Sequence, residues 1–311
     1  MKFSSTPRLR RIRYDRAAAG ESGAIWGGAF VRFKDLDGNS FHLVSFDAES
    51  RAVETQRRVA AERLEFDRRA ARELDLARQV QSRLFPQTMP HAATLEYAGL
   101  CIPALTVGGD YYDFLNLGRG RLGLVIGDIA GKGMGAALLM ANLQANLRGQ
   151  CAIALEEPVR FLCSVNQLFR ESTVESAYAT LLFAEYDDRT QVLRYANCGH
   201  LHGLLLRRDG VVDRLETTAS VLGLFEEWEC AIGEHALRPG DLLALYTDGV
   251  TESFSPGDEE FGEARLVDAL RGCTEKTPPD VLASVVDALR KWSPNDQHDD
   301  ITLIVARCRA C

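Results

Sequence analysis

Apolar and polar positions alternate in short runs between residues 94 and 311, and this pattern predicts an α+β domain. Strands are expected at 96–105, 111–117, 121–127, 179–185, 191–196, 203–207, 211–215, 230–235, 242–247 and 301–306. Helices are expected at 136–148, 158–171, 263–273 and 279–292, where apolar residues recur at helical spacing. Most strands follow one another through hairpins, so we expect a layered antiparallel β-sandwich flanked by helices. The regular β–α alternation of a dinucleotide-binding fold is missing.

A different pattern precedes this domain. Residues 48–85 contain no Gly or Pro, and the pair Glu54 and Arg58 has the favourable i,i+4 order. A narrow apolar stripe follows steps of three, four or seven, at Val53, Ala60, Leu64, Ala71, Leu74, Ala77 and Leu84. We expect one long helix that pairs weakly with a second copy, the alternative being a solitary charged helix folded back on the body. Pro86 and Pro90 end it, which predicts a coiled-coil-like linker at 48–89 and a folded domain at 90–311.

The first 47 residues form a third segment. Two apolar runs flank Asp37-Gly38-Asn39, a turn sequence typical of a β-hairpin. The stretch is similar to the closing hairpin of a glyoxalase-type module, but it would supply only His42 as a metal ligand. We therefore interpret residues 1–47 as a structural remnant or a docking hairpin.

The distribution of charged residues along the chain excludes some classes of binding partner. The chain has 311 residues and a net charge of −8. Residues 1–89 carry 17 Lys and Arg against 12 Asp and Glu (+5), which leaves 19 against 32 (−13) for residues 90–311. An acidic body is a poor partner for nucleic acid. No apolar run reaches the length of a membrane helix and the eight cysteines are scattered, so we expect a cytoplasmic protein that binds neither membrane nor nucleic acid.

Candidate chemistry begins with two aspartates on one predicted hairpin. Residues paired across an antiparallel turn centred on Arg119 have numbers that sum to 238, as do those of Asp110 and Asp128. Directly opposed carboxylates repel each other. A divalent cation between them would neutralise the charge, so the pair indicates an oxygen-ligand metal such as magnesium or manganese. Asp113 is expected on the opposite face of its strand.

Further carboxylates end other apolar strands. Asp248 follows the strand 242–247, and Asp299 and Asp300 precede the strand 301–306. A single Asp-Gly is usually a turn residue. Several aspartates at the ends of buried strands are harder to explain in that way, because a core strand gains nothing from an unpaired charge at its tip.

Five motifs in order resemble those of the SpoIIE-type serine phosphatases, a branch of the metal-dependent PPM protein phosphatases. They are VGGDYYDF at 107–114, GDIAGKGMGAAL at 127–138, ANCGH at 196–200, TDGVTE at 247–252 and DDIT at 299–302. The segment ARQVQSRLFP at 77–86 also resembles the helix that leads into the catalytic domain of regulatory members.

The resemblance implies a β-sandwich with a site for two divalent cations, manganese or magnesium, at one end. By motif position Asp110 and Asp128 would be the catalytic carboxylates, with Asp128 bridging both metals. The backbone carbonyl of Ile129 and the side chains of Asp248 and Asp299 would complete the ligands. Such a site activates water for attack on phosphorus and needs no protein nucleophile.

Other positions receive supporting roles. Asp300 and Gly109 are expected behind the ligands, Gly109 as a residue that lets the backbone approach the metals. Lys132, between two glycines, could meet the substrate phosphate or be a solvated loop lysine. Family members usually have prolines after Gly-His, whereas here Leu201 follows, and we expect His200 to be a packing or hydrogen-bonding residue.

Two functions remain after these steps. The first is a serine/threonine protein phosphatase that acts on a phosphorylated STAS-domain antagonist of an anti-sigma factor, the substrate that the resemblance implies. The second is a catalytically inert dimeric scaffold with the same fold.

Overall fold

A computed structural model describes residues 28–34, 40–46, 48–154, 157–173, 176–273, 275–294 and 297–310. Contacts within the chain divide it into two units, residues 1–73 and 74–311. In the first unit β1 (Gly28–Lys34) pairs antiparallel with β2 (Ser40–Phe46). This confirms the predicted hairpin, whose turn at 35–39 lies outside the described residues, as do residues 1–27.

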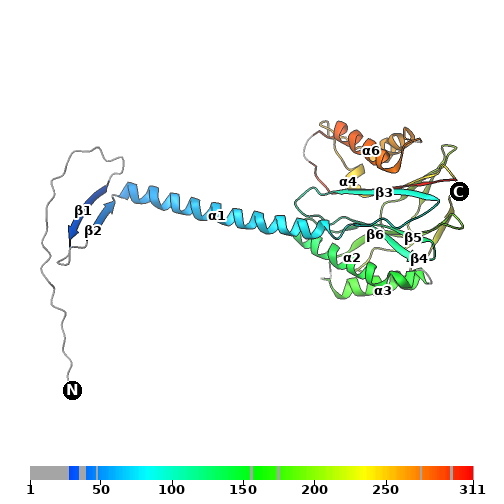
Figure 1. Ribbon diagram of the computed structural model, residues 1–311, viewed down its shortest axis with the longest axis horizontal. Helices are drawn as coiled ribbons and strands as arrows, with labels where there is room; N and C mark the ends of the chain where they lie inside the picture. The colour runs from blue at the N-terminus through cyan, green and yellow to red at the C-terminus, as the bar shows by residue number, and fades with distance from the viewer. Residues whose placement is uncertain are drawn as a thin grey trace, which may run out of the picture. The chain divides into compact units, whose positions relative to one another are not determined.

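The long helix is present as α1 (Ala48–Ser82) and is continuous through 35 residues (Figure 1). It ends three residues before the predicted boundary, at a turn closed by hydrogen bonds from Arg83 and Leu84 to the preceding carbonyls. Large apolar side chains are exposed along it, namely Val53, Val59, Leu64, Phe66, Leu74, Leu76 and Val80. The pairing of this helix with a second copy remains a prediction. Among the helices of the described residues, none combines the length and apolarity needed to cross a membrane.

The described part of the second unit contains two antiparallel five-stranded sheets, as predicted. The order of the first sheet is β10 (Gly233–Ala236), β7 (Val192–Cys198), β6 (Ala179–Asp187), β5 (Arg121–Ile129) and β4 (Tyr111–Gly118). That of the second is β3 (Leu95–Ile102), β12 (Ile301–Cys308), β11 (Leu242–Tyr246), β8 (Gly203–Leu206) and β9 (Val212–Leu215). Every predicted strand is present, with ends shifted by a few residues.

Helices cover both outer faces of the sandwich (Figure 1). The helices α2 (Met134–Ala154) and α3 (Pro158–Glu171) pack on the first sheet, and α5 (Gly262–Arg271) and α6 (Pro278–Trp292) pack on the second. One short helix, α4 (Asp248–Thr251), was not predicted, because four residues are too few to show a helical period.

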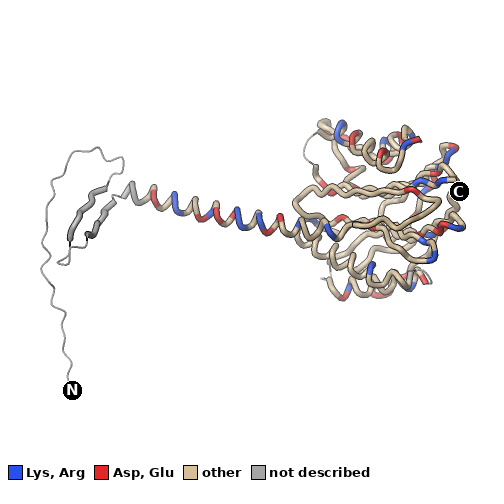
Figure 2. Tube along the Cα trace, in the orientation of Figure 1, with Lys and Arg blue, Asp and Glu red and all other residues tan. Residues whose placement is uncertain are grey.

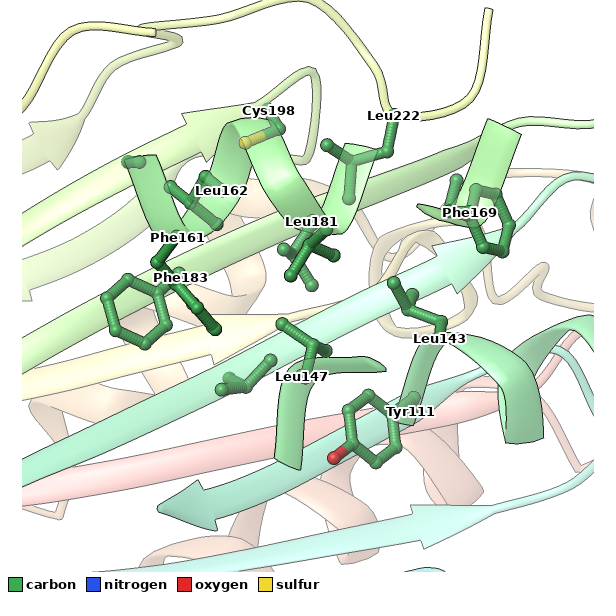
Figure 3. Packing of buried hydrophobic residues seen from close by; sticks show 14 of the residues in the cluster. Tyr111, Leu143, Leu147, Phe161, Leu162, Phe169, Leu181, Phe183, Cys198 and Leu222 are labelled. Atoms are coloured by element: carbon green, nitrogen blue, oxygen red, sulfur yellow. The ribbon is translucent and has the colours of Figure 1, made fainter. Parts of the chain in front are cut away.

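Three layers of buried side chains hold these elements together. One lies between the two sheets, one under α5 and α6, and one under α2 and α3. Figure 3 shows the last of these, where Leu143 and Leu147 lie near Tyr111 and the ring of Phe161 packs 5.3 Å from that of Phe183. This packing fixes β4 and β5, the hairpin that carries the two opposed aspartates.

A buried ion pair lies within the α2 layer. Asp113 is fully buried, and its two carboxylate oxygens each accept a 2.7 Å hydrogen bond from the guanidinium of Arg148 on α2. The Tyr111 hydroxyl donates to the same carboxylate. Asp113 therefore points to the α2 side of β4, away from the second sheet, as expected. The substitution Asp113→Asn would remove the charge that pairs with Arg148, so we expect it to change the stability of the protein.

We predict that Arg148→Met destabilises the protein by about 3 kcal/mol, because it leaves the Asp113 carboxylate buried without its charge partner. Chemical denaturation followed by circular dichroism measures the difference. Arg160→Met is the matched control, since Arg160 is 71% exposed and its ion pair with Glu157 lies at the surface. Equal stability of the two variants would contradict the prediction.

Candidate metal centre

The β4–β5 hairpin brings Asp110 and Asp128 together. Its paired residues from Tyr111 and Gly127 inwards have numbers that sum to 238, and Asp110 and Asp128 occupy the next positions outward. The turn itself is not centred on Arg119, because the register shifts after Asn116 and Gly118 pairs with Arg121. The two residues between them, Arg119 and Gly120, have positive φ angles of 54° and 76°. The shift lies at the turn end of the hairpin, so it does not disturb the predicted opposition.

Burial and mutual repulsion disfavour negative charge on this pair. Asp110 is 3% exposed, and its pKa is raised well above the usual range by burial and by the Asp128 carboxylate. The pKa of Asp128 is raised to about 7, first by burial and then by Asp248, Asp299 and Asp300. The three further carboxylates predicted from the sequence, Asp248, Asp299 and Asp300, thus lie close enough to Asp128 to raise its pKa.

The junction between β11 and α4 supplies the next group. Asp248 is the first residue of α4, and burial followed by the charge of Asp299 raises its pKa. The preceding residue, Thr247, donates a 2.7 Å hydrogen bond from its hydroxyl to Asp110. Thr247 was missed in the sequence analysis, although its place before Asp-Gly in the TDGVTE motif was a usable signal. This contact joins the second sheet to the hairpin of the first.

Asp300 holds the loop before β4 in place. Its carboxylate accepts hydrogen bonds from the backbone amides of Ala104 (2.7 Å) and Gly109 (2.9 Å). A Cβ atom at Gly108 would lie 1.9 Å from an Asp300 carboxylate oxygen, and one at Gly249 would lie 2.0 Å from the Asp300 carbonyl oxygen. Only glycine fits at these two positions, and Asp300 acts as a positioning residue for the loop that carries Asp110.

Two more contacts shape the same loop. A Cβ at Gly109 would lie 3.0 Å from the carbonyl oxygen of Ile129, so glycine leaves this oxygen uncrowded. On the other side, the buried amide of Gln81 donates to the Gly108 carbonyl (2.7 Å) and accepts from the Gly108 amide (3.1 Å). Gln81 was not predicted as a site residue, although it lies in the 77–86 segment that resembles the family.

Lys132 lies against the cluster. Its ammonium contacts an Asp299 carboxylate oxygen at 2.6 Å and donates to the His298 carbonyl at 2.9 Å. The hydrogen bond to Asp299 raises the pKa of Lys132. The lysine therefore contacts a predicted ligand, whereas its contact with a substrate phosphate stays a prediction.

His200 is neutral and fully hydrogen-bonded. Nδ1 lies 2.8 Å from the Thr180 hydroxyl and Nε2 lies 3.1 Å from the Tyr246 carbonyl oxygen. Burial lowers the pKa of His200 to about 4, so the ring donates from Nε2 and accepts at Nδ1. This geometry is that of a packing and hydrogen-bonding residue, as expected. His202 contacts Glu216 at 3.1 Å.

The side chains that meet here offer carboxylate oxygens, the ligands that magnesium and manganese prefer. In the described part of the chain, no group of three or more acidic, histidine or cysteine side chains is placed so that it could hold a metal ion. The buried Asp110 and the half-buried Asp128 nevertheless need a compensating positive charge, since desolvation and repulsion both act against ionisation. The residues present therefore fit hard divalent cations.

Sequence comparisons place the chain beside phosphatases. Residues 118–309 match the family model of stage II sporulation protein E (SpoIIE). The chain is 29% identical to Protein IcfG of Synechocystis sp. over 261 residues, which cover 75% of this chain and 41% of IcfG. It is 27% identical to phosphoserine phosphatase RsbU of Bacillus subtilis over 237 residues, 76% of this chain and 70% of RsbU. The match to IcfG thus spans less than half of that protein.

Solved structures show the same fold. The SiaA-PP2C domain of Pseudomonas aeruginosa superposes with a TM-score of 0.69 at 23% identity, covering 78% of this chain and 98% of that domain. The catalytic domain of the serine threonine protein phosphatase PstP, solved with 2 manganese ions, gives a TM-score of 0.53 at 18% identity, covering 70% and 99% of the two chains.

The raised pKa of Asp128 predicts that the metal-free protein loses stability as the pH rises from about 4 to about 7, because the folded state holds a proton that the unfolded state has released. The loss is on the order of a few kcal/mol, at 1.4 kcal/mol per pKa unit. Thermal melts in chelator across this range measure it. Manganese should restore the stability near pH 7, and Asp128→Asn should flatten the pH dependence. A flat profile for the wild type in chelator would contradict the prediction.

Proposed function

The chain belongs to the SpoIIE family of metal-dependent PPM serine phosphatases, and from this premise we propose that it hydrolyses phosphoserine or phosphothreonine in a protein substrate. The observation that carries the proposal is the meeting of Asp110, Asp128, Asp248, Asp299 and Asp300 at one end of the sandwich. These carboxylates come from four separate segments of the chain, and their burial is unfavourable without cations.

We propose that Asp110, Asp128, the Ile129 carbonyl, Asp248 and Asp299 would hold two divalent cations, manganese or magnesium. When bound, the two cations supply an activated water for in-line attack and offset charge on the phosphoryl oxygens. The chain itself orients this site. Thr247 directs the Asp110 carboxylate and Asp300 fixes the loop before it.

The substrate that we propose is a phosphorylated STAS-domain antagonist of an anti-sigma factor. Similarity to RsbU supports it, since that relative is a phosphoserine phosphatase. Charge supports a protein over a nucleotide, because residues 90–311 carry a net −13 that repels strongly anionic ligands at low salt. The open alternative, an inert scaffold, would have no need to keep like charges buried side by side.

We predict that Asp128→Asn and Asp248→Asn each lower manganese-dependent hydrolysis of p-nitrophenyl phosphate on the order of 100-fold or more, because each removes an anionic ligand. Asp300→Asn keeps one oxygen acceptor and replaces the other with an amide donor that faces a backbone N–H, so it should cost about tenfold. Steady-state assays with and without manganese give these ratios, with bound metal quantified in parallel.

Asp209→Asn is the control, since Asp209 lies in an exposed turn. Normal turnover by Asp128→Asn would refute the assignment. Wild-type protein that binds manganese but hydrolyses neither p-nitrophenyl phosphate nor a phosphoserine STAS protein would favour the scaffold instead.

We also propose that α1 supports a weak homodimer. Leu64 and Leu74 lie on the predicted stripe and are 51% and 37% exposed, so apolar area is available for a partner helix. We predict that Leu64→Asp with Leu74→Asp places like charges in this seam and shifts the protein to a monomer. Light scattering over a concentration series tests this. A wild type that is monomeric at every concentration would remove the dimer without affecting the phosphatase proposal.

A further inference from the structure

A cavity of about 460 Å³ lies at the end of the second sheet opposite to the carboxylate cluster. The strands β11 and β12 run between the cavity and the carboxylate cluster. Leu242 begins β11 at the cavity, and Asp248 follows the other end of that strand. Asp300 precedes β12, and Arg307 lies near the end of β12 at the cavity. Four arginines line this cavity, namely Arg207, Arg208, Arg271 and Arg307. Figure 2 shows Lys and Arg positions near the C-terminus, interspersed with Asp and Glu.

The charge of this cavity contrasts with that of the domain. Its lining contains the four arginines and a single acidic residue, Glu275, whereas residues 90–311 as a whole carry −13. Arg207 is neutralised by Asp213 (2.7 Å) and Asp241 (2.8 Å). Arg208, Arg271 and Arg307 also line the cavity, and Asp268 lies 3.5 Å from Arg271. The lining as a whole holds more arginines than carboxylates, an arrangement that attracts anions.

Two of the arginines are held in place. Arg207 is fixed by its two aspartates and by a hydrogen bond to the Ala236 carbonyl. Arg307 donates to the Cys273 carbonyl at 2.8 Å, and burial lowers its pKa, so a nearby anion would relieve the cost of its charge. These groups set a positive potential before any ligand arrives.

The other two arginines are available to turn toward a ligand. Arg208 is exposed, and within the described residues no side-chain hydrogen bond or ion pair holds its guanidinium. Arg271 is 53% exposed and makes long contacts to the Gly210 carbonyl (3.3 Å) and to Asp268 (3.5 Å). Paired guanidinium groups match the geometry of a phosphate group.

We propose that this cavity binds a small organic phosphate, such as a nucleoside polyphosphate, through Arg208 and Arg271. The cavity volume lies in the range of small-molecule sites, about 300–1,000 Å³. Leu206 and Leu242 at its base offer an apolar surface for the organic part. A concave site of this size suits a small ligand better than a nucleic acid, which needs an extended basic surface.

Calorimetric titration of the full-length protein with ATP tests the proposal, in chelator so that metal does not direct ATP to the carboxylate cluster. We expect saturable binding of ATP and no binding of adenosine. Arg208→Gln with Arg271→Gln should weaken ATP binding about tenfold or more, because it removes two charge-assisted contacts. The single variant Arg208→Gln, at an exposed position, should show part of the loss.

Arg160→Gln with Arg189→Gln is the matched control, because it changes the net charge equally at exposed sites away from the cavity. Unchanged ATP affinity in this control supports the site. If inorganic phosphate binds as tightly as ATP, the result would support the site and show that it recognises the phosphate group alone. No binding by ATP or phosphate, or equal ATP affinity in the cavity variant and the wild type, would overturn the proposal, and neither result bears on the phosphatase activity.

Discussion

Crowding of like charges at one end of the sandwich is the constraint on which the rest of the site depends. Asp110 and Asp128 stand opposite each other because the register of a single hairpin places them there, and burial raises the pKa of both. Water cannot relieve this repulsion at a buried carboxylate. The surrounding contacts therefore hold in place the loops that carry these carboxylates.

Two glycines and one aspartate fix the position of the loop before β4. Asp300 binds the backbone amides of the loop before β4, and it can approach only because Gly108 and Gly249 have no side chain in its way. Thr247 ties the second sheet to Asp110, and Gln81 ties the end of α1 to Gly108. The loop that carries Asp110 is thus fixed from the helix, from both sheets and from its own backbone.

The distribution of charge gives the domain two unlike ends. Carboxylates gather where β11 ends and β12 begins, and arginines gather where β11 begins and β12 ends. Because β11 and β12 are antiparallel neighbours, the start of one lies beside the end of the other, so both strands contribute residues to both ends of the sheet. At the first end, our proposal requires cations between the carboxylates and a phosphate monoester, whereas an anion at the second end would meet guanidinium groups directly.

Local sequence patterns were sufficient to predict the strands, the long helix and the opposition of Asp110 and Asp128. Each of these features depends on residues close together in the chain. The periodic spacing of 48–82 and the constant sum across one turn are properties of short segments. The roles of Asp300, Thr247 and Gln81 depended on tertiary structure. Asp300 meets Ala104 across 196 positions of sequence, and Thr247 meets Asp110 across 137. No local period encodes such contacts, since they exist only once two sheets have packed face to face. The same holds for the arginine cavity, whose walls come from a hairpin turn, the end of α5 and the end of β12.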